Sequence, residues 1–140
     1  MYRTILVAND GSSGARGALL AAIDMAKRDE ADLHQICVEE HLPHYAALMG
    51  EVIEAKEEAK EFFQKVIAEA NAAAAAQDVR LTSHVIPGHA VETIVTYAKD
   101  HDFDLLVIGF TGHSNIYGRI WGGTSQNLIR LAPCSVLVVK

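Results

Sequence analysis

Residues 109–125 place glycines and hydroxyl side chains at spacings that suit phosphate binding. The segment reads GFTGHSNIYGRIWGGTS, from Gly109 to Ser125. The apolar run before it, residues 105–108, indicates a buried parallel strand, and residues 125–131 after it have the pattern of an amphipathic helix. Glycines let backbone N–H groups approach an anion, and a helix N-terminus adds unpaired donors and a positive dipole. The segment therefore predicts a phosphate-binding loop without a P-loop lysine, because no Gly-Lys-Ser/Thr is present.

Composition and charge limit the classes of function. The chain has 140 residues, which fits a single domain (1–140) with a substantial core, and half of them are hydrophobic. Its 18 acidic and 12 basic residues give a formal net charge of −6. This balance argues against wide nucleic-acid contact, which needs a basic surface. No apolar run approaches the ~18 residues of a membrane span or forms a signal sequence. We expect a cytoplasmic protein that is not a membrane protein, although a membrane partner is compatible with it.

Neither the cysteines nor the histidines suggest a metal site. Cys37 and Cys134 lie far apart, each among apolar residues, so buried free thiols are favoured over a disulfide. No C-x-x-C or Cys/His cluster suggests zinc. His41 and His44 form an H-x-x-H pair in a loop without carboxylate or cysteine partners, which is weak support for a metal. We predict none.

Apolar strand patterns alternate with helical patterns along the chain. The expected strands are residues 4–8, 33–38, 79–86, 105–108 and 136–139, and the expected helices are 13–28, 45–77, 90–99 and 125–131. This alternation predicts an α/β fold, a doubly wound five-stranded parallel sheet with helices on both faces. Ligands of such folds bind at the carboxyl ends of the strands, where the strand order reverses. We therefore expect Asn9 and Asp10, after the first strand, to face the loop that begins at Gly109.

The last strand, Val136–Val139, is strongly apolar and is expected at an edge of the sheet. An exposed apolar edge invites pairing with another strand. A homodimer joined through this strand would cover it.

Four stretches together resemble the universal stress protein family, and the resemblance covers essentially the whole chain. They are the opening 2–12, the Pro-Gly-His-Ala turn at 87–90, residues 101–109 and the ending 132–139. The nucleotide-binding signature of the family is Gly-x2-Gly-x9-Gly-(Ser/Thr). Gly109, Gly112 and Gly122 fit it, with nine residues between the last two.

The resemblance implies the strand order 3-2-1-4-5, an adenine nucleotide alpha hydrolase-like fold, and a homodimer that binds ATP, ADP or AMP, with Mg²⁺ accompanying a triphosphate. It implies that the nucleotide state regulates a partner or a stress response. Asp10 would accept a hydrogen bond from the ribose or adenine side, backbone groups at the end of the second strand would bond adenine, and the glycine loop would enclose the phosphates. The implied nucleotide-binding residues are Ala8, Asn9, Asp10, Cys37, Val38, Gly109, Thr111, Gly112, His113, Gly122, Gly123, Thr124 and Ser125.

One position departs from the family pattern. Gly123 stands where the signature has Ser or Thr, so a side-chain donor is missing, and the next hydroxyls belong to Thr124 and Ser125. We expect the missing donor to affect the preference for ATP over ADP or AMP more than it affects nucleotide binding itself. Thr124 and Ser125 are expected to cap the following helix whether or not phosphate binds.

Several alternatives remain open. Asp10 is also a common type of residue for capping the helix that follows it. A nucleotide-independent interaction module that regulates a transporter or other partner is favoured by Gly123 and by the acidic stretch Glu51–Glu61. No Ser/His/Asp set or paired carboxylates are arranged for catalysis, so we predict no catalytic residues and at most slow ATP hydrolysis. A response-regulator receiver is disfavoured because the third strand ends in Pro87-Gly88 and not in an aspartate.

Overall fold

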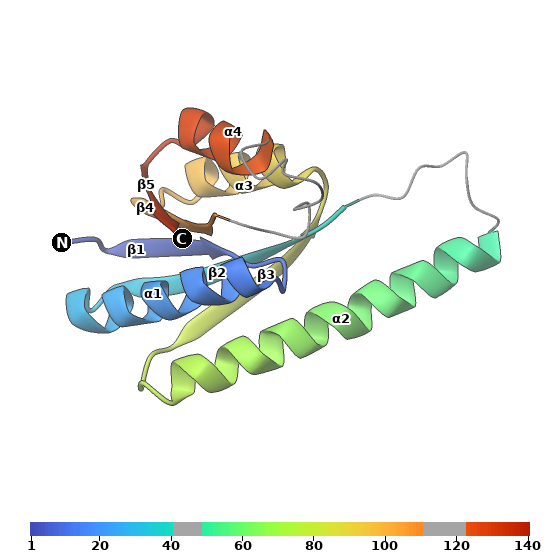
Figure 1. The fold of residues 1–140 in the computed structure, drawn as a ribbon, viewed down its shortest axis with the longest axis horizontal. Helices are drawn as coiled ribbons and strands as arrows, with labels where there is room; N and C mark the ends of the chain where they lie inside the picture. Colours follow the sequence, from blue (N-terminus) through green and yellow to red (C-terminus); the bar gives the residue numbers. More distant parts are fainter. Residues whose placement is uncertain (41–48, 111–122) are drawn as a thin grey trace.

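Strands and helices alternate along the chain in a computed structural model that describes residues 1–40, 49–110 and 123–140 (Figure 1). The elements are β1 (Thr4–Ala8), α1 (Ser13–Asp29), β2 (Asp32–Glu39), α2 (Met49–Ala75), β3 (Leu81–Pro87), α3 (Ala90–Asp100), β4 (Leu105–Gly109), α4 (Gly123–Leu131) and β5 (Ser135–Val139). All nine predicted elements are present. Three boundaries differ from expectation by two residues: α2 ends at Ala75 and not at residue 77, β3 begins at Leu81 and not at residue 79, and α4 begins at Gly123 and not at Ser125. Several other ends differ by one residue.

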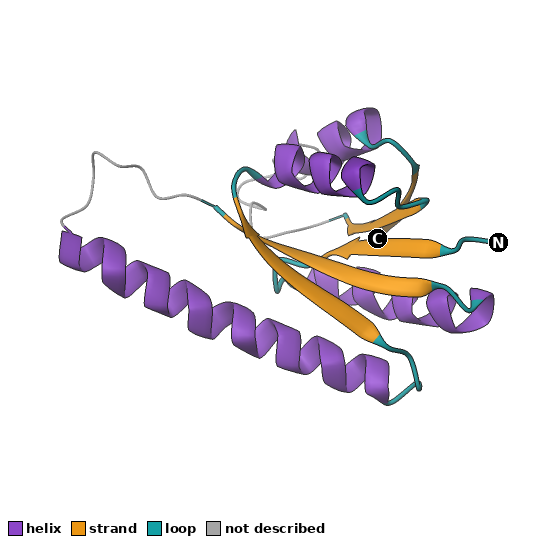
Figure 2. Ribbon diagram, turned by 180° about the vertical axis from the view of Figure 1, so that it is seen from behind, coloured by secondary structure: helices purple, strands orange, loops and turns teal. Residues whose placement is uncertain are grey.

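The five strands form one parallel sheet in the order β3-β2-β1-β4-β5, which confirms the predicted fold class. Helices α1 and α2 cover one face, and α3 and α4 cover the other (Figures 1 and 2). The strand order reverses at β1, which pairs with β2 on one side and β4 on the other. The ends of these three strands therefore lie together at the carboxyl edge of the sheet.

The central position of β1 in the sheet explains why its sequence is continuously apolar. Ile5 and Val7 pack in the core beneath α1 and α2, whereas Leu6 packs in the core beneath α3 and α4. Their side chains are 0% exposed. Because neighbouring residues of a strand point to opposite faces, a strand covered on both faces needs apolar residues at every position.

Two histidines on neighbouring strands form a close pair on the α3 face. His34 Nδ1 of β2 lies 3.0 Å from His84 Nε2 of β3, and the two rings are stacked. Tyr97 of α3 contacts the ring of His84, and the ring of His101 lies against Tyr97 at a tilt of 33°. One of the two paired nitrogens must lack a proton to accept from the other, so the hydrogen bond requires that at least one ring stay neutral.

We predict that this pair makes the protein less stable in acid. Burial lowers the pKa of both His34 and His84 below the usual 6.5; Asp32 opposes this at His34, whereas His101 adds to it at both rings. The unfolded chain then binds more protons as the pH falls below 6.5, so the stabilisation is complete above that pH and is lost below it. Urea titrations at pH 7.5 and 5.0 should give a lower free energy of unfolding at pH 5.0.

The control for this prediction is His84→Gln, in which an amide that does not titrate in this range replaces the ring. The difference in free energy of unfolding between the two pH values should shrink by about 1 kcal/mol, the typical net value of one hydrogen bond. An unchanged difference in the variant would assign the acid sensitivity to other groups.

Candidate functional site

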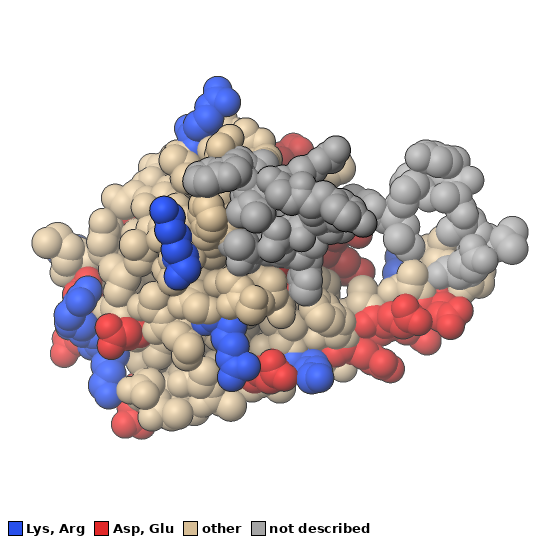
Figure 3. Space-filling model, in the orientation of Figure 1, with Lys and Arg blue, Asp and Glu red and all other residues tan. Residues whose placement is uncertain are grey.

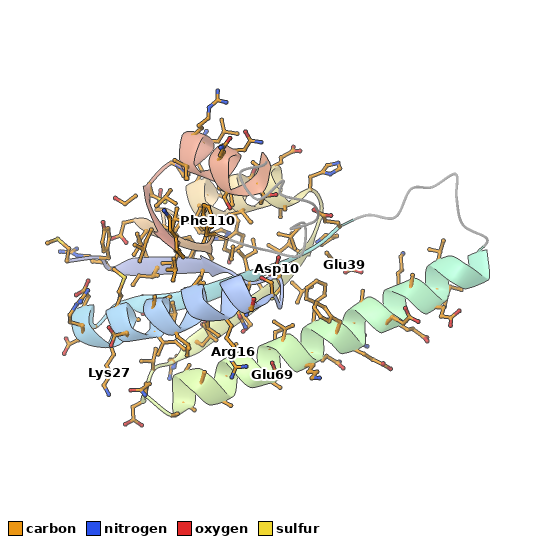
Figure 4. All side chains as sticks on the ribbon, in the orientation of Figure 1. Asp10, Arg16, Lys27, Glu39, Glu69 and Phe110 are labelled. Atoms are coloured by element: carbon orange, nitrogen blue, oxygen red, sulfur yellow. The ribbon has the colours of Figure 1, made fainter. Side chains whose placement is uncertain are left out.

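The turn after β1 is held in one conformation by its own side chains. Asn9 N donates to the Ile36 carbonyl over 3.0 Å, and Asn9 Oδ1 accepts from Gly11 N over 3.0 Å. Asp10 Oδ1 accepts from Ser12 N over 3.0 Å. These bonds fix the loop that presents Asp10 at the carboxyl edge of the sheet, the end at which Figure 4 also labels Glu39, the last residue of β2.

The N-cap of α1 is Ser12 and not Asp10, which corrects the alternative reading of Asp10 as a helix cap. The hydroxyl of Ser12 accepts from Ala15 N over 3.1 Å. The Asp10 side chain is exposed, and its carboxylate closes the short turn that leads into this cap. Asp10 is therefore at the surface of the edge where ligands of this fold class bind.

Gly109, the last residue of β4, lies against the first turn of α1. A Cβ atom on Gly109 would be 2.5 Å from the backbone carbonyl carbon and oxygen of Gly14. The hydroxyl of Ser125, in the first turn of α4, donates to the Gly109 carbonyl over 3.4 Å. Two helix N-termini therefore meet the end of β4, and both present partial positive charge. Glycine is required here for packing, in addition to any role with phosphate.

The first turn of α4 begins with an exposed glycine. Among residues 1–40, 49–110 and 124–140, no atom would lie within 4 Å of a Cβ atom built on Gly123. Because α4 begins at Gly123, Thr124 and Ser125 lie inside its first turn and are not its N-cap, contrary to expectation. The first N–H groups of a helix lack partners within it, so this turn can donate to an anion.

At the end of β2, Cys37 can offer only its backbone to a ligand. Its side chain is 0% exposed and packs with Phe63 and Val66 of α2. Burial, with a further contribution from the Asp10 carboxylate, raises the pKa of the Cys37 thiol to about 12, so the thiol is neutral. The prediction of free thiols is confirmed for both cysteines, and burial is confirmed for Cys37, whereas Cys134 is partly exposed.

The remaining site predictions have mixed outcomes. Ala8 and Val38 are partly buried at the ends of β1 and β2, on the expected edge. Four predicted residues, Thr111, Gly112, His113 and Gly122, lie outside the described residues, as do His41 and His44. Within residues 1–40, 49–110 and 123–140, no group of three or more His, Cys, Asp or Glu side chains could hold a metal ion. Over the same residues, no helix is long and apolar enough to cross a membrane.

Sequence reasoning missed two polar residues behind this edge, Gln35 and Ser83. Gln35 is 0% exposed in the middle of β2, and its Nε2 donates to Ser83 Oγ of β3 over 2.7 Å. Asn9 Nδ2 donates to Gln35 Oε1 over 3.0 Å. The available signal was a glutamine within an otherwise apolar strand pattern, which predicts a buried side chain in need of partners.

A groove of about 280 Å³ lies at the opposite end of the molecule. It is lined by the end of α1 and the starts of β2 and β3, with Lys27, Glu30, Asp32, Asp78 and Arg80 around it. None of the predicted nucleotide-binding residues borders it. Because ligands of this fold class bind at the carboxyl edge, we do not regard the groove as the candidate site.

Comparison with known sequences identifies one family over the full length. The model of the universal stress protein family matches residues 1–140. Universal stress protein YxiE of Bacillus subtilis is 30% identical over 148 residues, covering 100% of both chains. A universal stress protein of Thermus aquaticus is 33% identical over 142 residues, again covering 100% of both. Universal stress protein MJ0531 of Methanocaldococcus jannaschii is 29% identical and is covered over 83% of its length.

Solved structures of the same family superpose on this chain. Universal stress protein UspA from Lactobacillus plantarum has a TM-score of 0.79 and 29% identity, with 99% of this chain and 98% of the other covered. A universal stress protein in complex with cAMP has a TM-score of 0.78 and 27% identity, with 99% and 97% covered. A third, from Archaeoglobus fulgidus in complex with dAMP, is 19% identical with a TM-score of 0.64 over 99% and 98% of the chains, and is similar in fold.

Proposed function

This chain belongs to the universal stress protein family, and we propose that it binds an adenine nucleotide at the carboxyl edge of its sheet. The observation that carries the proposal is the convergence of the N-termini of α1 and α4 on Gly109, at the edge that also presents Asp10. Helix N-termini suit phosphate, and an exposed carboxylate suits ribose hydroxyls. A similar protein was solved with cAMP, which supports the same class of ligand.

The proposed contacts use mostly backbone groups. The N–H groups of the first turn of α4 (Gly123–Ser125) would donate to phosphate oxygens, and the Asp10 carboxylate would accept from the ribose. The backbone groups of Cys37 and Val38 would recognise the adenine edge. When a triphosphate is bound, Asp10 or water would supply an oxygen ligand to an accompanying Mg²⁺ ion. In this proposal the protein is cytoplasmic and its nucleotide state regulates a partner or a stress response, with at most slow ATP hydrolysis.

Analysis of nucleotide carried through purification tests the proposal directly. The purified protein is denatured and the released small molecules are identified by mass spectrometry, then the stripped protein is titrated with ATP, ADP and AMP in a calorimeter. We expect an adenine nucleotide in the first experiment or binding heat in the second. The absence of both would rule out the proposed function.

A homodimer through β5 is part of the proposal. β5 is the last strand of the sheet, and Val136–Val139 keep partial exposure along it. Pairing of two such edges would bury these apolar side chains and satisfy the outer backbone groups. Sedimentation equilibrium should then give twice the mass of the chain, and a single-chain mass at micromolar concentration would contradict this part.

The alternative, a nucleotide-independent interaction module, is favoured by the surface of α2. Exposed glutamates form a red band along this helix in Figure 3; they are Glu54, Glu57, Glu58 and Glu61. On the same helix Ile53 is 56% exposed. A cell-based assay with Asp10→Ala separates the two functions: a lost stress phenotype supports nucleotide dependence, whereas an unchanged phenotype supports the interaction module.

We predict that Gly123→Ser increases affinity for ATP by roughly tenfold, the effect of one added hydrogen bond to a charged group. The hydroxyl would supply the side-chain donor that the family signature has at this position, and no atom of the residues that the structure describes would lie within 4 Å of the added Cβ atom. Calorimetric titration compares the variant with wild type. Gly123→Ala is the matched control and should bind ATP as wild type does; an equal gain with alanine would show that the hydroxyl is not responsible.

A further inference from the structure

We infer that Gln35 is a positioning residue that holds the Asn9–Gly11 turn in the conformation that receives the ligand; the inference rests on the proposed function. Gln35 lies in β2, directly beside Val7 of β1 and Ser83 of β3. Its side chain is 0% exposed, and that of Asn9 is 5% exposed. Two amide side chains are thus buried side by side, immediately behind the edge that presents Asp10.

The direction of every hydrogen bond in this network is determined by the backbone. The Gly11 N–H can only donate, so the Asn9 atom that contacts it over 3.0 Å is the acceptor Oδ1. Asn9 Nδ2 must then donate, over 3.0 Å, to Gln35 Oε1. Gln35 Nε2 in turn donates to Ser83 Oγ over 2.7 Å. The bonds run without interruption from the turn, through β2, to β3.

The hydrogen-bonded side chains of Asn9, Gln35 and Ser83 interrupt the apolar core between the sheet and helices α1 and α2. Leu33 and Cys37, two residues before and after Gln35, pack beneath α1 and α2, and alternate residues of a strand share a face. A buried polar group must be paired, and a fully paired network permits one arrangement of its members. Gln35 therefore specifies the rotamer of Asn9, which an apolar residue at position 35 could not do.

The rotamer of Asn9 controls the turn itself. Gly11 has φ +81°, a conformation that its N–H bond to Asn9 helps to hold. On its other side Gly11 is covered by Phe62, whose ring carbon would be 2.6 Å from a Cβ atom there. The turn therefore packs against Phe62 of α2 on one side and is hydrogen-bonded to Asn9 on the other. These contacts fix the backbone from which the Asp10 carboxylate projects. Without Gln35, Asn9 could rotate and the ligand would have to order the turn on binding.

The test uses two variants of the full chain and titration with AMP and with ATP–Mg²⁺. Gln35→Leu keeps the size of the side chain and removes both bonds, and we expect affinity to fall roughly tenfold, since a buried polar group loses its partner. Gln35→Glu when protonated keeps both bonds with their present directions, and burial favours this form. When it ionises, the Ser83 hydroxyl can turn to donate to it, but a negative charge is then buried in the core beside Asn9, which disfavours the ordered turn. Relative to wild type at each pH, it should bind nearly normally at pH 5.5 and progressively more weakly toward pH 8. The matched control is Ile23→Val in α1, which loosens the core away from this edge and should bind as wild type does.

Amide hydrogen exchange at Gly11 separates this inference from the proposed function. In Gln35→Leu without ligand, Gly11 should lose protection while the amides of α3 keep theirs. Suppose that Gly11 loses protection in Gln35→Leu but that the wild-type protein binds no nucleotide. The positioning role of Gln35 would then stand, and only the proposed function would be overturned. Unchanged Gly11 protection together with unchanged affinity in Gln35→Leu, or a Gln35→Glu variant that binds independently of pH, would overturn the inference.

Discussion

Gly109→Ala is expected to lower the free energy of unfolding by about 3 kcal/mol, the upper end of typical overpacking effects. The added Cβ atom would lie 2.5 Å from the Gly14 carbonyl group and 2.9 Å from Ala15 N, which are backbone atoms of α1. A flexible side chain could turn away from such a contact, but the first turn of a helix packed on β1 and β4 cannot. The strand β4 and the helix α1 would have to separate, which loosens the core beside β1, the strand at which the order reverses. Urea denaturation followed by circular dichroism measures the effect.

The matched control for Gly109→Ala is Gly17→Ala in α1. A Cβ atom at Gly17 would meet Val139 Cγ1 at 3.8 Å, an ordinary contact. Alanine in a helix interior should stabilise the protein by about 0.5–1 kcal/mol relative to glycine. If both variants had similar stability, close packing of β4 on α1 would not be the reason for glycine at position 109.

Asp10→Ala is expected to weaken adenine nucleotide binding by roughly ten- to a hundredfold, because hydrogen bonds to a charged group contribute about 1.5–3 kcal/mol. The exposed carboxylate is the acidic group of the turn that the network behind it holds in place. Calorimetric titration with AMP and ATP gives the affinities, and thermal unfolding of the ligand-free variant checks that the fold persists.

The isosteric variant Asp10→Asn separates charge from geometry. Its Oδ1 can still accept from Ser12 N, so the turn is retained while the negative charge is lost. We expect affinity between that of wild type and Asp10→Ala. Wild-type affinity in Asp10→Ala would remove this residue from the proposed site and leave the phosphate contacts of α4 to account for binding.

The fold was predictable because its signals are local. A strand covered on both faces needs an unbroken apolar run, as in Ile5-Leu6-Val7. The edge strand β3, in contrast, mixes polar and apolar residues and has no fully buried position. Alternating elements leave few topologies once right-handed connections are required. The boundaries were less predictable: Gly123 has low helix propensity, so nothing local indicated that α4 begins there.

The location of the candidate site was predictable in part. The resemblance and the turn residues led to Asp10 and Gly109, which the structure brings to one edge, whereas the N-cap of α1 belongs to Ser12. Helix capping depends on where the backbone first turns helical, and four candidate residues in sequence, from Asp10 to Ser13, can supply it or the turn before it.

The sequence by itself determined the order of elements, the buried faces of the central strands and the glycine spacing of the segment that precedes α4. Each of these depends on the chemistry of residues close together in the chain. Only the tertiary structure decided that Gly109 lies on the backbone of Gly14 and that Gln35 joins Asn9 to Ser83. These contacts link residues that are far apart in sequence. They depend on how the strands and helices pack against one another in three dimensions, which the chemistry of neighbouring residues does not specify.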